Sequence, residues 1–124
     1  MELETPYVHL CTRNKILVGT YKANQRISID AAKDIVRTRK KFTSGIPMPA
    51  LIISQGLVSI DRPARKYLSS EEATTGLKAC AIVVNSAFSS FLGNFFLTVY
   101  KTTMPVRIFP TVEKAEKWLQ HFIE

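Results

Sequence analysis

The sequence has few of the residues that catalytic, metal and redox sites require. It contains two histidines and two cysteines in 124 residues, and it lacks both a Gly-x-Ser-x-Gly nucleophile signature and a glycine-rich phosphate loop. His9 and Cys11 lie two apart and share a strand face, but catalytic zinc normally takes three protein ligands, and His121 is the only other histidine. We therefore expect no metal, no cofactor and no enzymatic activity. A hydrolase or metal enzyme that uses His9 or His121 is the minority alternative.

Long apolar runs are also absent. No run approaches the roughly 18 residues that a membrane-spanning helix needs, so membrane insertion is not expected. The start, MELETPYVHL, lacks the basic-then-apolar layout of a signal peptide, which predicts a cytoplasmic protein. Cys11 and Cys80 fall in apolar, strand-like runs and are expected to be buried free thiols. A disulfide between neighbouring strands stays open as an alternative, because it depends on the Cα separation.

Positive charge is in excess, with a net charge of +7. One basic group, at positions 37–41, stands near a helix end, where cations complement the helix dipole. A second group stands at a helix start, which presents free amides and makes it a candidate anion or ligand loop. This candidate loop consists of Asp61, Arg62, Arg65 and Lys66. The alternative is a solvated surface without a ligand. Nucleic acid is not an expected partner, because the aromatic residues are not interleaved with Lys and Arg.

Apolar periodicity divides the chain into alternating strands and helices after a flexible tail at residues 1–6. Strands are predicted at residues 7–12, 16–21, 50–54, 77–84 and 106–109, the first two forming a β-hairpin. Residues 7–124 should then form a single α/β domain. Its expected fold is a mixed, mostly parallel five-stranded sheet that opens with a β-hairpin and is flanked by about four helices.

Capping residues set the helix boundaries. Ser28 and Thr111 are predicted N-caps, since a hydroxyl accepts from the unpaired amides of a first turn. Gly45 should end the first helix, and Asp61 should begin the second, where Pro63 is tolerated in the first turn. A further cap is predicted within residues 69–72.

One predicted helix, at residues 87–100, is apolar around more of its circumference than packing on a sheet requires. We call it the Phe-rich segment. It is either a core helix or a surface for a homodimer, a protein partner or an apolar ligand, and the homodimer is preferred because Ser89 and Gly93 permit close packing. The candidate surface consists of Phe88, Phe91, Leu92, Phe95, Phe96 and Val99.

Four stretches carry a resemblance to a known family: ISIDAAKDIVRTRKKF, SEEATTGLKACAIVV, GNFFL at 93–97 and the closing TVEKAEKWL. Over about residues 7–122 the chain resembles the STAS-like, SpoIIAA-like proteins, in particular small stand-alone versions from Bacteroidetes-type bacteria. The resemblance implies an α/β fold and a non-enzymatic module that docks a protein regulator or binds a small ligand. Related folds are grouped with lipid-carrying Sec14-type domains.

One position departs from that family. In its anti-sigma factor antagonists, a strand leads into an Asp-Ser pair, and the serine is the phosphorylated switch. The resemblance places Asp61 on the aspartate and Arg62 on the serine. Because arginine is not a substrate of a serine kinase, the phosphoswitch is not expected here. The main hypothesis is therefore an interaction module, and the alternative is a carrier or sensor of a small apolar ligand beside the Phe-rich segment.

Overall fold

The computed structural model describes residues 2–56, 59–83 and 104–123, which form a six-stranded sheet, a two-stranded sheet and four α-helices. The large sheet has the order β1-β2-β3-β5-β7-β8. Its strands are β1 (Glu2–Glu4), β2 (Val8–Arg13), β3 (Ile16–Tyr21), β5 (Met48–Ser54), β7 (Leu77–Val83) and β8 (Val106–Phe109). The small sheet pairs β4 (Arg26–Ile27) with β6 (Ser59–Ile60).

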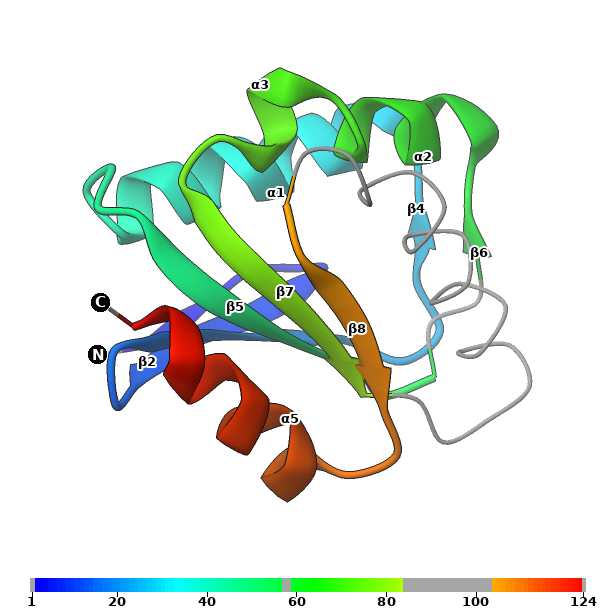
Figure 1. Ribbon diagram of the computed structural model, residues 1–124. Helices are drawn as coiled ribbons and strands as arrows, with labels where there is room; N and C mark the ends of the chain where they lie inside the picture. Colours follow the sequence, from blue (N-terminus) through cyan, green and yellow to red (C-terminus); the bar gives the residue numbers. More distant parts are fainter. Residues whose placement is uncertain (1, 57–58, 84–103, 124) are drawn as a thin grey trace.

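The helices cover the two faces of the large sheet unequally. They are α1 (Ile29–Phe42), α2 (Arg62–Leu68), α3 (Glu71–Thr74) and α5 (Val112–Leu119), and α5 continues into the 3-10 turn η1 (Gln120–Phe122). Figure 1 shows α1, α2 and α3 together on one side of the sheet and α5 on the other. Two separate clusters of buried apolar residues correspond to these two sides.

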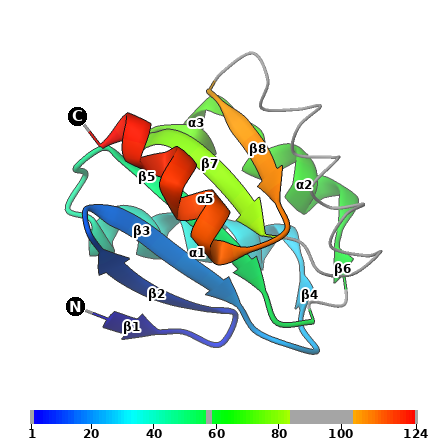
Figure 2. The same ribbon diagram turned by 60° about the horizontal axis from the view of Figure 1, so that its bottom comes forward.

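The pairing pattern confirms the predicted mixed, mostly parallel sheet. β1, β2 and β3 are antiparallel, and β3, β5, β7 and β8 are parallel. Figure 2 shows the antiparallel strands at one end of the sheet and β8 at the other. The sheet has six strands rather than five because Glu2–Glu4, expected to belong to a flexible tail, pairs with β2. The two-residue strands β4 and β6 were not predicted either.

The predicted caps are confirmed at three helices. The hydroxyls of Ser28, Ser70 and Thr111 accept from the backbone amides three residues further on. Gly45 follows α1 with a positive φ of 73°, as a residue that ends a helix commonly does. Asp61 stands at the N-cap position of α2, but its side chain makes no capping hydrogen bond.

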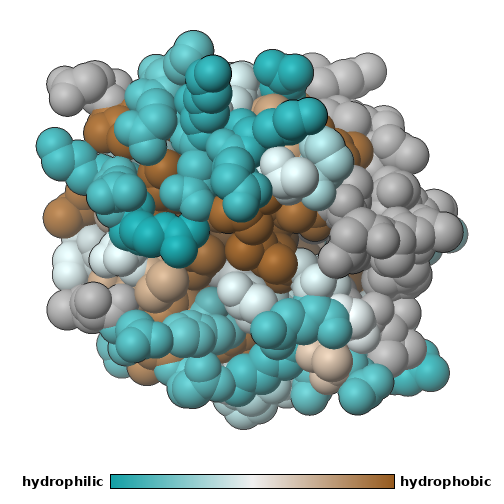
Figure 3. Space-filling model, turned by 90° about the horizontal axis from the view of Figure 1, so that it is seen from below, coloured by the Kyte–Doolittle hydropathy of each residue, from teal (hydrophilic) through white to brown (hydrophobic). Residues whose placement is uncertain are grey.

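The surface on the α5 side is hollowed. Seen from that side, hydrophobic side chains gather in a hollow between hydrophilic ones above and below it (Figure 3). Half-buried apolar residues that pack on the core of this side include Cys11, Ile53 and Trp118. Across the described ranges, no helix is long and apolar enough to span a membrane.

Candidate functional site: an apolar cavity under the helices

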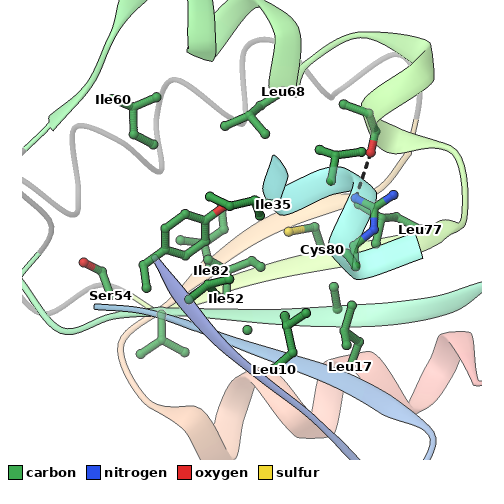
Figure 4. Close-up of a pocket in the computed structure, with 18 residues that line it drawn as sticks. Leu10, Leu17, Ile35, Ile52, Ser54, Ile60, Leu68, Leu77, Cys80 and Ile82 are labelled. Carbon is green, nitrogen blue, oxygen red and sulfur yellow. Dashed lines mark hydrogen bonds between the residues drawn. The ribbon is translucent and has the colours of Figure 1, made fainter. Parts of the chain in front are cut away.

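A cavity of about 80 Å³ lies between the large sheet and the helices α1, α2 and α3. In Figure 4, Leu10, Leu17 and Ile52 project into it from the sheet, and Leu68 and Ile60 lie opposite. The sheet contributes Val8, Leu10, Leu17, Gly19, Tyr21, Ala50, Ile52, Ser54, Leu77, Cys80, Ile82 and Val83 to the lining. Ile35, Val36 and Arg39 of α1, Ile60 of β6, Leu68 of α2 and Ala73 of α3 complete its described part.

Small residues at neighbouring strand positions explain the space. Residues that face one another across strands share a face of a sheet, and the register pairs Gly19 with Ile52 and Ala50 with Cys80. A Cβ atom built on Gly19 would lie 3.6 Å from the nearest atoms, Cδ1 of Ile52 and Cδ2 of Leu10, which is ordinary contact distance. The cavity wall therefore has room for a Cβ atom at position 19.

Two hydroxyl groups stand where β3 and β5 end. Tyr21 and Ser54 are partners in the register at the carboxyl ends of these parallel strands, and both line the cavity. Carboxyl ends of parallel strands are the usual place for ligands in open α/β sheets. Within the described ranges, the Tyr21 hydroxyl has no hydrogen-bond partner, although the side chain is half-buried. It is thus a polar group at the edge of an apolar space.

The Tyr21 hydroxyl and the Cys80 thiol, which both line the cavity, are neutral at ordinary pH. Burial raises the pKa of the Tyr21 hydroxyl to about 12, and the neighbouring Cys80 adds to this effect while Arg39 opposes it. Burial likewise raises the pKa of the Cys80 thiol to about 12, again opposed by Arg39. A thiol is an effective nucleophile only as the thiolate, so Cys80 is not activated.

Basic side chains at the end of α1 hold α3 in place. Arg39 Nη1 donates to the carbonyl oxygen of Ala73 at 2.8 Å, and its Nη2 donates to that of Thr75 at 2.9 Å. Lys40 Nζ donates to the carbonyl oxygen of Glu72 at 2.5 Å. The last carbonyls of a helix have no intrahelical donor, and these cations supply one. The cavity therefore has a fixed, positively charged end.

The predicted anion or ligand loop lies elsewhere. Asp61, Arg62 and Lys66 are exposed and Arg65 is half-buried, and none of these residues lines the cavity. The Asp61 amide donates to the carbonyl oxygen of Ile27, which joins the start of α2 to the small sheet.

The predicted partner or dimer surface lies outside the described residues. Its members are Phe88, Phe91, Leu92, Phe95, Phe96 and Val99.

The two histidines lie away from the cavity. His9 is held by β1, with Nε2 2.9 Å from Oε1 of Glu2 and Nδ1 3.0 Å from Oε1 of Glu4. His121 is in η1, beyond α5. In the parts of the chain that the structure describes, no group of three His, Cys, Asp or Glu side chains could hold a metal ion. Both cysteines are free thiols, Cys80 buried and Cys11 half-buried.

The cavity was not predicted from the sequence, although one signal pointed to it. Gly19 stands inside an apolar strand run, and a glycine there often marks close approach of a ligand or another backbone. Tyr21 alternates with Gly19 and so shares its face. The sequence alone could not show that the helices would leave the space beside Gly19 unfilled.

Comparison with known families identifies the chain but not its role. A family model described as a domain of unknown function, DUF7793, matches residues 10–123, and the chain belongs to that family. No curated protein matches the sequence.

Comparison with solved structures confirms the fold. The chain is similar to an uncharacterized protein of the DUF3478 family with a SpoIIAA-like fold from Shewanella loihica PV-4, at 14% identity and a TM-score of 0.60. The similarity covers 90% of this chain and 91% of the other. The predicted SpoIIAA-like fold is therefore confirmed.

Proposed function

We propose that this member of the DUF7793 family is a non-enzymatic binding module that holds a small apolar ligand between its sheet and the helices α1–α3. The cavity carries the proposal, because its described lining is mostly aliphatic. Pockets for drug-sized ligands measure roughly 300–1,000 Å³, so a cavity of about 80 Å³ suits only a short aliphatic chain. A dry apolar cavity binds such groups readily.

The protonation states in the cavity support binding rather than catalysis. Tyr21 and Cys80 both have a pKa of about 12 and stay neutral near pH 7, where a general base or nucleophile would need a value closer to the working pH. Neither histidine lines the cavity. A neutral hydroxyl and a neutral thiol orient a ligand and do not attack it.

Native mass spectrometry of protein purified from its own host tests this proposal. Wild-type protein should carry a discrete small adduct, and Gly19→Val should not, because the valine side chain occupies the cavity. Thr20→Val is the matched control, since residue 20 points to the other face of the same strand. An adduct retained by Gly19→Val would place the ligand elsewhere. The absence of any adduct on the wild type, with no response to added ligand, would contradict the proposal.

A second candidate function is docking of a protein, either another copy of this chain or a regulator. The hollow on the α5 side favours it, with Cys11 and Ile53 half-buried on that face (Figure 3). The homodimer inferred from the Phe-rich segment stays a prediction. Cys11→Lys should lower the dimer fraction measured by light scattering, because a dimer interface on this face would bury the ammonium. The far-UV spectrum of the monomer should be unchanged, because there the lysine extends its ammonium to water. A wild-type monomer at all concentrations would remove this candidate as a homodimer.

A further inference from the structure

A second cleft, whose lining includes two cationic and two hydroxyl side chains, adjoins the apolar cavity. It has a volume of about 130 Å³ and shares Leu17, Arg39 and Leu77 with the cavity. Its remaining described lining is Lys40, Thr43, Gly45, Thr75 and Gly76. The shared residues make the two spaces neighbours, with Arg39 at their common boundary. A ligand with one apolar and one polar end fits this arrangement.

The charged side chains of the cleft favour an anionic group at the polar end of the ligand. Arg39 and Lys40 line it, and no carboxylate is among the described residues that line either space. Within the described ranges, the Lys40 ammonium makes a single hydrogen bond, to the carbonyl of Glu72, whereas an ammonium carries three donors. Thr43 and Thr75 also line the cleft, and their hydroxyls donate to the backbone carbonyls of Lys40 and Glu71.

The end of α1 opposes this charge only in part. A helix C-terminus behaves as roughly half a negative charge, whereas Arg39 and Lys40 bring two positive charges to the same place. Their bonds to the carbonyls of α3 are to neutral groups, which leave the formal charge in place. Arg39 and Lys40 therefore bring more positive charge to the cleft than the end of α1 offsets.

We infer that the ligand is an amphiphile, with a short aliphatic tail in the apolar cavity and an anionic carboxylate or phosphate head in the second cleft beside Arg39 and Lys40. This inference rests on the proposed function and adds the class of ligand to it. The head is held by charge-assisted hydrogen bonds, and the neutral Tyr21 lies at the tail end of the cavity, where β3 ends.

Calorimetric titration with three ligands of the same tail tests the inference. Nonanoate, octyl phosphate and 1-octanol carry the same octyl tail and differ only in the head group. Nonanoate or octyl phosphate should bind about tenfold more tightly than 1-octanol, a difference of about 1.4 kcal/mol, since a hydrogen bond to a charged group is stronger than one between neutral groups. Whichever anion binds more tightly identifies the head as a carboxylate or a phosphate.

Variants separate the head group from the tail. Lys40→Gln should abolish most of the preference for the anions while 1-octanol binding is unchanged, and Lys40→Arg should restore it. Lys117→Gln, an equal charge change on an exposed position of α5, is the control and should leave the preference intact. Gly19→Val should abolish binding of all three ligands.

Each negative outcome has its own meaning. Equal affinity of the wild type for 1-octanol and the anions, unaffected by Lys40→Gln, would overturn the anionic head while the apolar-ligand proposal stands. Failure of the wild type to bind any of the three would overturn both. Loss of 1-octanol binding in Lys40→Gln would assign Lys40 to the fold and contradict its role at the head group.

Discussion

Beside α5, small residues of the sheet meet a close-packed helix, whereas under α1 small residues border an empty space. Ala81 of β7 is fully buried in one cluster with Ala115 and Leu119 of α5. Gly19 and Ala50 are just as small, but they line the cavity. Small strand residues thus allow close helix packing only where side chains of the helix fill the space beside them.

Aromatic packing marks the α5 side. The rings of Phe109 and Trp118 lie 5.6 Å apart, and those of Trp118 and Phe122 lie 4.9 Å apart in an edge-on arrangement. Arg107 lies over the Phe109 ring at 5.1 Å. These contacts stabilise the end of the sheet against α5. On the α1 side, Tyr21 is the single aromatic residue in the described lining of the cavity.

The largest expected difference between the two sides comes from truncating a leucine on each. Leu119→Ala should lower the free energy of unfolding by about 4 kcal/mol, because Leu119 is 0% exposed in the filled cluster. Leu10→Ala should cost only about 2 kcal/mol, because Leu10 already faces empty space. Urea unfolding of both variants measures this. Equal losses would show that the cavity is filled in solution.

Enlarging a small residue should have opposite signs on the two sides. Ala81→Val should destabilise by about 1–3 kcal/mol, because a filled core has no room for added methyl groups. Gly19→Val should instead stabilise by about 1 kcal/mol, since it fills the cavity and valine favours a strand. Thermal unfolding monitored by circular dichroism compares the two. A destabilised Gly19→Val would contradict the assigned space at position 19.

Alkaline pH should weaken the α1 side. Burial raises the pKa values of Cys80 and Tyr21 to about 12, above their values of about 9 and 10 in an unfolded chain. Their contribution to stability is full below about pH 9 and is lost as the pH rises toward 12, because the unfolded chain releases the protons first. Each group should lower the unfolding free energy by roughly 1.4 kcal/mol per pH unit in that window.

Replacing these groups isolates their share. Stability of Cys80→Val, measured by urea unfolding from pH 8 to pH 11, should fall less steeply than that of the wild type. The stability of Tyr21→Phe should also fall less steeply than that of the wild type, but the difference should start at a higher pH, near pH 10. Identical slopes in all three proteins would contradict the burial of both groups.

The smallest effect is expected at the outer edge of the sheet, in β1. A hydrogen bond from Lys22 lowers the pKa of Glu4, so its contribution is present at neutral pH and is lost as the pH falls through that lowered value. Because Glu4 is exposed, only β1 should respond. Amide exchange of Leu3, corrected for its intrinsic pH dependence, should lose protection below about pH 4. Lys22→Gln should shift this loss to higher pH.

Local chemistry made most of the fold predictable. The alternation of Val8–Arg13 and Ile16–Tyr21 predicted the hairpin, and Ser28 and Thr111 predicted helix starts through a bond that each residue makes within its own turn. β1 was missed because its sequence is short and charged. β1 is held by contacts of Glu2 and Glu4 with His9. These contacts depend on the register in which β1 pairs with β2, which the sequence of β1 does not specify.

The site was harder to predict than the fold. An apolar cavity consists of what neighbouring residues leave unfilled, and that depends on the distance between α1 and the sheet. Gly19 gave the local signal, whereas the proximity of Arg39 to Leu77 required the tertiary fold. The sequence predicted a site at Arg62 and Lys66 instead, because a cluster of charged residues can be recognised in a sequence. An unfilled space between side chains of the folded protein cannot.

Methyl-resolved NMR during titration with 1-octanol tests the central claim most directly, because it reports on both faces of the sheet at once. The account predicts chemical-shift changes at the methyl groups of Leu10, Ile52 and Ile82, and none at Leu51 or Leu119 on the α5 side. Unchanged methyl groups around the cavity, or changes confined to the α5 side, would contradict the claim that the space beside Gly19 is a ligand site.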